Sequence, residues 1–333
     1  MQPFEYANPA TLEQASRLLG TEPGRSAVLA GGSDLLNLIK DGVEAPRRLV
    51  SIKSIEGISG VRPGDGGGLR IGALITLDDL AGDAAVGWEY PALARAAAGV
   101  AGPQVRNVAT LGGNLCQRPR CWYFRNGFGL LAQQDGKSLV VDGDNRYHAI
   151  LGNDGPAYFV QPSTLAPLLI AIGARITLFG PNGARRVLLK DFYRTPKAEG
   201  EREYDLQPGE VLTEVLLPPA AGRKLATYEV RQREALDWPL ATAAVVLEME
   251  GDSNKVAQAS VVLGQVAPVP WVAEKLQELL KGKMIDEKVA AAAGEVAVEG
   301  AKALSRNRYK IQLAKVAVKR ALLTAAGLLQ AEP

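Results

Sequence analysis

Cysteine and histidine are scarce in this sequence, which contains two cysteines, Cys116 and Cys121, and a single histidine, His148. Two cysteines exclude the framework of several disulfides that holds many small secreted domains together, so a reducing compartment is the expected setting. A lone histidine in a polar stretch is more often a hydrogen-bonded or surface residue than a general base. We therefore assign no catalytic role to His148.

The sequence also lacks an excess of charge, long apolar runs and the common nucleotide motifs. Its 38 basic and 36 acidic residues are interspersed and give a net charge of +2, which argues against a nucleic-acid partner. No apolar run approaches the roughly 20 residues of a transmembrane helix, and residues 1–6 resemble no export signal. Neither GxGxxG nor GxxxxGKS/T occurs, which argues against a Rossmann site or a nucleoside-triphosphate loop.

A short apolar strand that breaks into two glycines is the first positive signal. It reads Val28-Leu29-Ala30-Gly31-Gly32-Ser33-Asp34-Leu35 and continues as an amphipathic helix that Gly42 ends. Glycines let a ligand approach the main chain closely, and the amides of Gly32, Ser33 and Asp34 would be the unpaired donors of a helix start, where an anion is favoured. The motif therefore predicts a pyrophosphate cradle. The alternative is an ordinary Gly-Gly turn capped by Ser33.

A second pair of glycines follows in Arg106-Asn107-Val108-Ala109-Thr110-Leu111-Gly112-Gly113-Asn114-Leu115. We interpret this stretch as another strand that runs into a glycine turn. Each pair of glycines lies beside a hydroxyl and an amide or carboxylate side chain, so the two turns together could grip opposite sides of one elongated phosphorylated ligand.

The rest of the chain suggests two further units after residues 1–55, whose helices and strands alternate. Residues 56–218 contain the second glycine pair, irregular residues 116–160 and several strands, and the sequence at 218–222 is typical of a linker. Residues 222–330 have strands first and then helices, which we expect at 271–280, 286–304 and 309–329. This segregation indicates an α+β domain, and 333 residues suffice for three units.

The two glycine motifs resemble the FAD-binding subunit of the molybdenum hydroxylases, the xanthine dehydrogenase family. The likeness includes Arg231-Gln232-Arg233, residues 263–271 (LGQVAPVPW) and Tyr309-Lys310, and so extends nearly from end to end. Residues 117–125 and 142–150 look most like the aldehyde oxidoreductase branch. The resemblance implies an α+β protein: a two-subdomain flavin-binding domain of the PCMH/VAO type, 1–55 and 56–218, followed by the smaller C-terminal domain, 222–330, of the carbon monoxide dehydrogenase flavoprotein type.

The resemblance also implies which residues contact FAD. In the first loop Ala30, Gly31, Gly32, Ser33 and Asp34 would line the pyrophosphate, with Leu29 and Leu35 beside it. In the second loop the implied contacts are Thr110, Gly113 and Asn114, with Cys116 as an apolar contact after them. Ser163 matches a serine of the flavin site, and Thr164 is the residue after it. Leu212 matches an apolar residue near the flavin ring, and Glu229 occupies a charged position near the flavin.

Three departures from the family pattern matter. Thr164 stands where relatives commonly have aspartate, and Glu229 stands where several have lysine, so a positive charge near a reduced flavin must come from elsewhere. In the aldehyde oxidoreductase branch, residues 116–150 contain further cysteines that bind a four-iron cluster, which as a rule needs four thiolates. With two cysteines, this chain is expected to hold no metal.

The implied function is that of an oxidoreductase subunit. It would pass electrons from the two-iron clusters of a small partner through FAD to an external acceptor, while a large molybdenum-cofactor partner oxidises the substrate. The alternatives are a self-sufficient flavin oxidase of the vanillyl-alcohol oxidase type and a non-catalytic scaffold with a degenerate flavin site. We expect a cytoplasmic protein by default, or a periplasmic one if a partner subunit carries the export signal.

Overall fold

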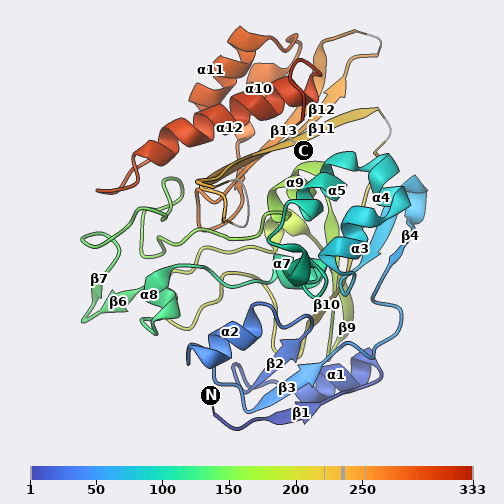
Figure 1. The fold of residues 1–333 in the computed structure, drawn as a ribbon, viewed down its shortest axis with the longest axis vertical. Coiled ribbons are helices and arrows are strands. Elements are labelled where there is room, and N and C mark those ends of the chain that lie inside the picture. The colour runs from blue at the N-terminus through green and yellow to red at the C-terminus, as the bar shows by residue number, and fades with distance from the viewer. Residues whose placement is uncertain (1, 221, 234–236, 252, 332–333) are drawn as a thin grey trace.

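The structure is a computed structural model that describes residues 2–220, 222–233, 237–251 and 253–331. In Figure 1 the N-terminal elements lie at the bottom, the C-terminal helices lie at the top, and a mixed layer of strands and helices lies between them. Ala221, within the predicted linker, lies outside the described residues.

The N-terminal elements form a small parallel sheet with strand order β1-β3-β2. Helix α1 begins after Thr11, whose hydroxyl accepts the Gln14 amide, and ends at Gly20 with a φ of 68°. Its apolar side packs on β3, and Val211 of the middle sheet joins the same core. The elements are β1 (Glu5–Ala7), α1 (Leu12–Leu19), β2 (Ser26–Leu29), α2 (Leu35–Lys40) and β3 (Arg48–Ser51).

The middle of the chain forms a five-stranded antiparallel sheet of order β4-β5-β10-β8-β9, to which helices are added. Thr76 caps α3 as its spacing to Asp79 predicts, because its hydroxyl accepts the Asp79 amide. The strands are β4 (Val61–Pro63), β5 (Leu69–Gly72), β8 (Arg175–Gly180), β9 (Gly183–Leu188) and β10 (Val211–Leu217). The helical elements are η1 (Asp65–Gly67), α3 (Leu77–Gly82), α4 (Ala84–Glu89), α5 (Pro91–Ala98), α6 (Pro103–Arg106), α7 (Leu111–Leu115), α9 (Ala166–Ile172) and η2 (Leu189–Asp191).

The strand predicted to run into the second pair of glycines is wrong. Pro103 starts the short helix α6, and Thr110 caps the short helix α7, which contains both glycines of the second motif. Thr110 pairs with Thr76 only through an isolated bridge. A proline at the first helical position and a capping threonine favour helical turns here over the predicted strand.

Residues 116–160 are irregular, as predicted, and extend to one side of the molecule in Figure 1. We call residues 117–150 the insertion. Its regular elements are short: α8 (Trp122–Arg125), β6 (Gln133–Gln134) and β7 (Lys137–Ser138).

The C-terminal part has strands first and helices after, as predicted, and its own apolar core. Its antiparallel sheet has the order β11-β12-β13-β14, with α12 against β11 and β12, and α9 of the middle part against β12 and β13. The elements are β11 (Arg223–Val230), β12 (Ala241–Met249), β13 (Val256–Gly264), β14 (Trp271–Val272), α10 (Glu274–Leu280), α11 (Glu287–Ala297) and α12 (Tyr309–Ala325).

The helix predicted over 271–280 is wrong in its first residues. Trp271 and Val272 pair with Leu263 and Val262, and the helix begins only at Glu274. An aromatic and a β-branched residue suit a sheet edge better than a helix start. The helix expected over 286–304 ends at Ala297, and the last helix ends at Ala325. The domain boundaries at 55 and 218–222 stay a prediction.

Candidate cofactor-binding site

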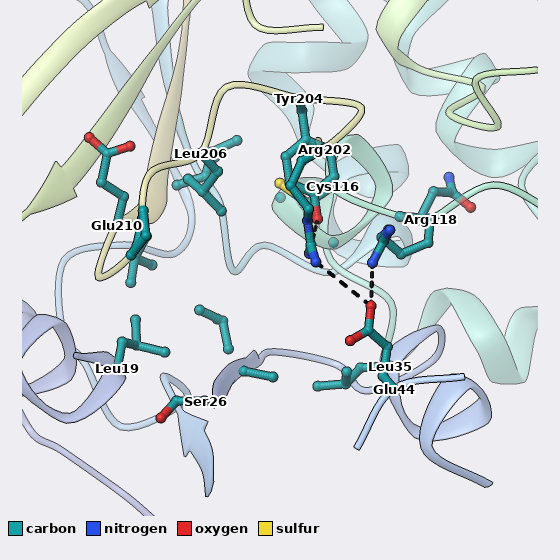
Figure 2. A pocket seen from close by; sticks show the side chains of 18 of the residues that line it. Leu19, Ser26, Leu35, Glu44, Cys116, Arg118, Arg202, Tyr204, Leu206 and Glu210 are labelled. Carbon is teal, nitrogen blue, oxygen red and sulfur yellow. Dashed lines mark hydrogen bonds and ion pairs between the residues drawn. The ribbon is translucent and has the colours of Figure 1, made fainter. Parts of the chain in front are cut away.

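A cavity of about 1010 Å³ lies between the N-terminal elements, α7 and the segment that precedes β10. This volume is at the upper end of ordinary ligand pockets, which span roughly 300–1,000 Å³. Figure 2 shows its walls, with Leu19, Ser26 and Leu35 on one side and Leu206, Tyr204 and Arg202 facing them. Ten of the residues predicted for the site line this cavity: Ala30, Gly31, Gly32, Ser33, Asp34, Leu35, Thr110, Gly113, Cys116 and Leu212.

The first glycine loop presents free main-chain donors. Within the described residues, the amides of Gly31 to Leu35 donate to no protein acceptor. Gly32 has a φ of 77°, which residues with a Cβ rarely adopt. Asp34, rather than Ser33, occupies the N-cap of α2, and its side chain accepts no helix amide. The cap by Ser33 that the alternative assumed is therefore wrong, and the loop has N–H groups at the cavity that no described residue accepts.

Gly31 brings the two glycine motifs together. A Cβ on Gly31 would lie 1.8 Å from the carbonyl oxygen of Val108 and 3.2 Å from the Cα of Ala109. Atoms cannot approach so closely, so a glycine is required at this position for the loop before α7 to pack on the first motif. The close approach that we expected from a ligand is made here by the chain itself.

The second glycine loop is different, because its amides are already bonded. The Leu111 amide donates to the Ile75 carbonyl, the Gly112 amide to the Ala73 carbonyl and the Gly113 amide to the Thr110 hydroxyl, at 2.8–3.1 Å. The two turns were expected to grip one phosphorylated ligand together, but the amides of Leu111 to Gly113 in the second turn are not free to bind it. These amides fix α7 to the middle sheet, and this brings Thr110, Gly113 and Cys116 to the cavity wall.

The carboxylate of Asp34 faces the insertion and is neutralised there. One oxygen lies 2.9 Å from an Arg125 nitrogen and 3.1 Å from an Arg120 nitrogen, and the other accepts the Arg118 amide at 2.8 Å. A free carboxylate would repel a diphosphate on the neighbouring amides, and pairing with two guanidinium groups removes most of that repulsion.

One wall of the cavity is a charged network that the sequence reasoning missed. The buried guanidinium of Arg118 forms close ion pairs with Glu203 and Glu44, and Arg202 lies 3.8 Å from Glu44. Figure 2 shows the contacts of Glu44 with Arg118 and Arg202. Glu44 follows α2, whereas Arg202 and Glu203 precede β10. The network therefore joins the N-terminal elements to the middle part across the cavity. The only part of this network that the sequence analysis had noted is Arg118, in the run Gln117-Arg118-Pro119-Arg120.

The remaining wall is apolar. Leu19, Leu35, Leu38 and Leu212 contribute aliphatic surface, and Cys116 lies at the end of α7. Burial raises the pKa of the Cys116 thiol to about 12. Cys116 is therefore an uncharged thiol at neutral pH and behaves as a small apolar residue.

Two polar residues predicted for the site lie behind α7 rather than at the cavity. The Ser163 hydroxyl donates to the Asn114 side-chain oxygen at 2.6 Å and accepts the Ala166 amide at the start of α9. Thr164 beside them is 4% exposed, and its hydroxyl has no partner among the described residues. Such an orphaned polar atom in the interior is unusual in a folded protein.

Leu29 and Glu229 are also absent from the cavity wall. Leu29 ends β2 directly before the first loop. Glu229 lies on β11, where it pairs with Arg231, whose guanidinium also donates to the Gly99 carbonyl. Burial raises the pKa of Glu229. Glu229 thus joins the C-terminal sheet to α5, and the structure does not bring it to the other predicted residues.

Cys121 and His148 meet inside the insertion. The Cys121 sulfur lies 3.2 Å from the Nε2 of His148, whose ring packs beside Trp122 and Tyr123. Burial and the nearby Lys310 lower the pKa of His148 to about 4, so the ring is neutral at pH 7. Among the described residues, no three His, Cys, Asp or Glu side chains form a group suited to a metal ion. The absence of an iron–sulfur cluster stays a prediction.

The residues present fit a large dinucleotide with a diphosphate. Free amides of a glycine loop suit the diphosphate, and an apolar wall next to them suits an aromatic ring system. The fold and the site together define a flavin-binding subunit, with two loops at one cavity and a separate α+β domain beyond it.

Comparison with known families identifies the chain. Residues 2–220 match the FAD binding domain in molybdopterin dehydrogenase, and residues 226–325 match the CO dehydrogenase flavoprotein C-terminal domain. This protein therefore belongs to the FAD-binding medium subunits of the molybdenum hydroxylase family, and it is an oxidoreductase subunit.

Individual relatives and solved structures agree with this assignment. The chain is 33% identical to the aldehyde oxidoreductase FAD-binding subunit PaoB of Escherichia coli K12, over 95% of this chain and 96% of that protein. It is 31% identical to the carbon monoxide dehydrogenase medium chain of Hydrogenophaga pseudoflava, over 96% of both. A solved carbon monoxide dehydrogenase from that organism superposes with a TM-score of 0.75, at 29% identity and 98% coverage of both chains.

Proposed function

We propose that this chain is the electron-transfer subunit of a molybdenum hydroxylase complex. Electrons would come from the two-iron clusters of a small partner subunit and leave to an external acceptor, while a large partner with the molybdenum cofactor oxidises the substrate. The names of the relatives support this proposal, because one is the medium chain of carbon monoxide dehydrogenase and another is an aldehyde oxidoreductase subunit. FAD supplies the redox chemistry, and the protein supplies binding, orientation and electrostatics.

The observation that supports the proposal best is the contrast between free and bonded amides at the cavity. The N–H groups of Gly32 to Leu35 have no acceptor in the part of the chain that the structure describes, and they would bind the diphosphate. Thr110 and Gly113 would complete the wall opposite, while Cys116, Leu35 and Leu212 would contact the ring system. No side chain is required to act as an acid or a base.

The remaining predicted residues would act from behind the cavity wall. We propose that Asn114, Ser163 and Thr164 orient α7 and the start of α9, and that Leu29 sets the end of β2. Glu229 stays a prediction, since it lies on another sheet and is bonded to Arg231. For a positive charge near a reduced flavin, the candidates among the residues that line the cavity are Arg118, Arg194, Lys197 and Arg202.

The location of the protein in the cell is also a proposal. None of the helices in the described ranges has both the length and the apolar character that crossing a membrane requires. We propose a cytoplasmic protein, or a periplasmic one if a partner subunit brings the export signal.

The direct test is to express the full chain alone and titrate it with FAD. We expect a yellow protein that binds FAD in a 1:1 ratio and lacks hydroxylase activity until the partner subunits are added. A folded chain that stays colourless with excess FAD would support the scaffold alternative. Substrate oxidation by the chain alone would support the oxidase alternative. Iron analysis of the same sample tests the predicted absence of a cluster.

A further inference from the structure

Gln265 is a buried polar residue of the C-terminal part with an unusual backbone. It directly follows β13, is 3% exposed, and has a φ of 58°. Residues other than glycine rarely adopt such a φ, and they do so mainly where the surroundings hold them there. Here the main-chain carbonyl of Gln265 accepts the Lys310 ammonium at 2.6 Å, from inside α12.

The side chain of Gln265 faces the middle part of the protein. Its oxygen accepts the Thr242 hydroxyl at 2.9 Å, and this bond determines which way the amide group points. Its nitrogen donates to the carbonyl oxygens of Pro162 and Ser163 at 3.3 and 3.4 Å. The three residues Gln265, Thr242 and Ser163 are each at most 3% exposed.

From Ser163 the contacts continue to the cavity. The Ser163 hydroxyl donates to the Asn114 side chain, and Asn114 lies in α7 between Gly113 and Cys116, which both line the cavity. The close packing of the C-terminal part on α9 reinforces this path, because a Cβ on Gly264 would lie 2.8 Å from Pro167. A continuous set of hydrogen bonds therefore joins β12 and β13 to α7.

The segment around Ser163 also contains buried hydrogen-bond donors that are unsatisfied among the described residues. The Gln161 side-chain nitrogen and the Thr164 hydroxyl are buried and have no partner among the described residues, although the Gln161 oxygen accepts the Ser163 amide. Buried donors of this kind are almost always satisfied in native proteins, by protein, water or a ligand. The residues on both sides of Ser163 therefore have hydrogen-bonding capacity that no described residue satisfies, although the segment itself does not line the cavity.

We propose that Gln265 is a positioning residue for the FAD site: it fixes the main chain at Pro162 and Ser163, and through Ser163 it fixes Asn114 and α7. This inference rests on the proposed function, because it assumes that α7 contacts FAD. It assigns the C-terminal domain a part in cofactor affinity, in addition to any contact with partner subunits.

The test measures the FAD dissociation constant of the full-length Gln265→Met variant. Methionine has a similar length but cannot donate to the two carbonyls, so we expect FAD binding to weaken about tenfold, with a changed visible circular dichroism spectrum of the bound flavin. Gln258→Met is the matched control, since Gln258 is an exposed residue of β13. It should bind FAD as the wild type does.

Two further variants separate positioning from a general loss of stability. Thr242→Val removes only the hydroxyl that orients Gln265, and it should weaken FAD binding in the same direction by a smaller factor. If Gln265 acts through Ser163, the Gln265→Met and Ser163→Ala effects on the dissociation constant should be less than multiplicative in the double variant.

The outcomes distinguish this inference from the proposed function. A wild-type chain that does not bind FAD would refute the proposed function itself. A wild type that binds FAD, together with Gln265→Met and Thr242→Val variants that bind it equally tightly, would overturn the positioning role alone. Fully multiplicative effects in the double variant would also overturn it. If Gln265→Met does not fold, the FAD dissociation constant of Thr242→Val still tests the positioning role.

Discussion

The two glycine loops look alike in sequence but differ in structure. Gly31 and Gly32 follow a strand, and their loop leaves main-chain amides without a partner among the described residues. Gly112 and Gly113 instead lie inside a short helix whose first amides are all bonded. One loop is therefore suited to hold an anion, and the other serves to hold the wall of the cavity in place. Similar motifs can supply a binding surface in one place and a support for it in another.

Disrupting the contact between the two glycine loops should cause the largest loss of stability and of FAD binding. Gly31→Ala would place a methyl group 1.8 Å from the Val108 carbonyl oxygen, so the two loops must separate. We expect a loss of about 3 kcal/mol in the free energy of unfolding, measured with urea, and loss of FAD binding.

Gly87→Ala is the matched control for Gly31→Ala. Gly87 lies within α4 with open space around its Cβ position, so alanine should be tolerated or slightly stabilising there. If Gly31→Ala behaved like Gly87→Ala, the two loops would not be in the contact described here.

Acidification should affect the insertion rather than either loop. His148 has a pKa of about 4 in the folded chain, because it is buried, against an ordinary value of 6.5. Between these values the unfolded chain binds more protons, so stability falls as the pH is lowered from 6.5 to 4, by up to about 3 kcal/mol. The slope should be smaller in His148→Gln, when the unfolding free energy of both proteins is measured across this range. An identical slope would show that His148 is not buried as a neutral ring.

Much of the fold could be predicted from local patterns, and the failures have a common cause. The cap at Thr76 and the strands-then-helices order of the C-terminal part depend on neighbouring residues, and they are confirmed. The helical state of 111–115 depends instead on bonds to Ala73 and Ile75, which are distant in the sequence. A β-branched residue before two glycines could not reveal those bonds.

The same reasoning applies to the cavity. The glycines, Thr110 and Cys116 were recognisable from the motifs and their resemblance to a family. Glu44 and Glu203 could not be recognised, because the sequence of one segment does not show which distant charged residue it pairs with. The neutralisation of Asp34 by Arg120 and Arg125 is hidden in the sequence for the same reason.

Smaller losses of stability are expected when either of two capping threonines is replaced. Thr110 caps α7 and Thr76 caps α3, so alanine at either position should cost about 1 kcal/mol of stability. Only Thr110→Ala should also weaken FAD binding, because Thr110 lines the cavity and Thr76 does not. Thr110→Ser should restore both properties. Equal FAD affinity in the two alanine variants would argue against a role of α7 in the site.

Amide hydrogen exchange with and without FAD tests most directly whether the first loop holds the diphosphate. In the FAD-free chain the amides of Gly32 to Leu35 should exchange quickly and those of Leu111 to Gly113 slowly, and FAD should slow exchange in the first loop by at least tenfold. Unchanged exchange in Gly32 to Leu35 at saturating FAD would contradict the assignment.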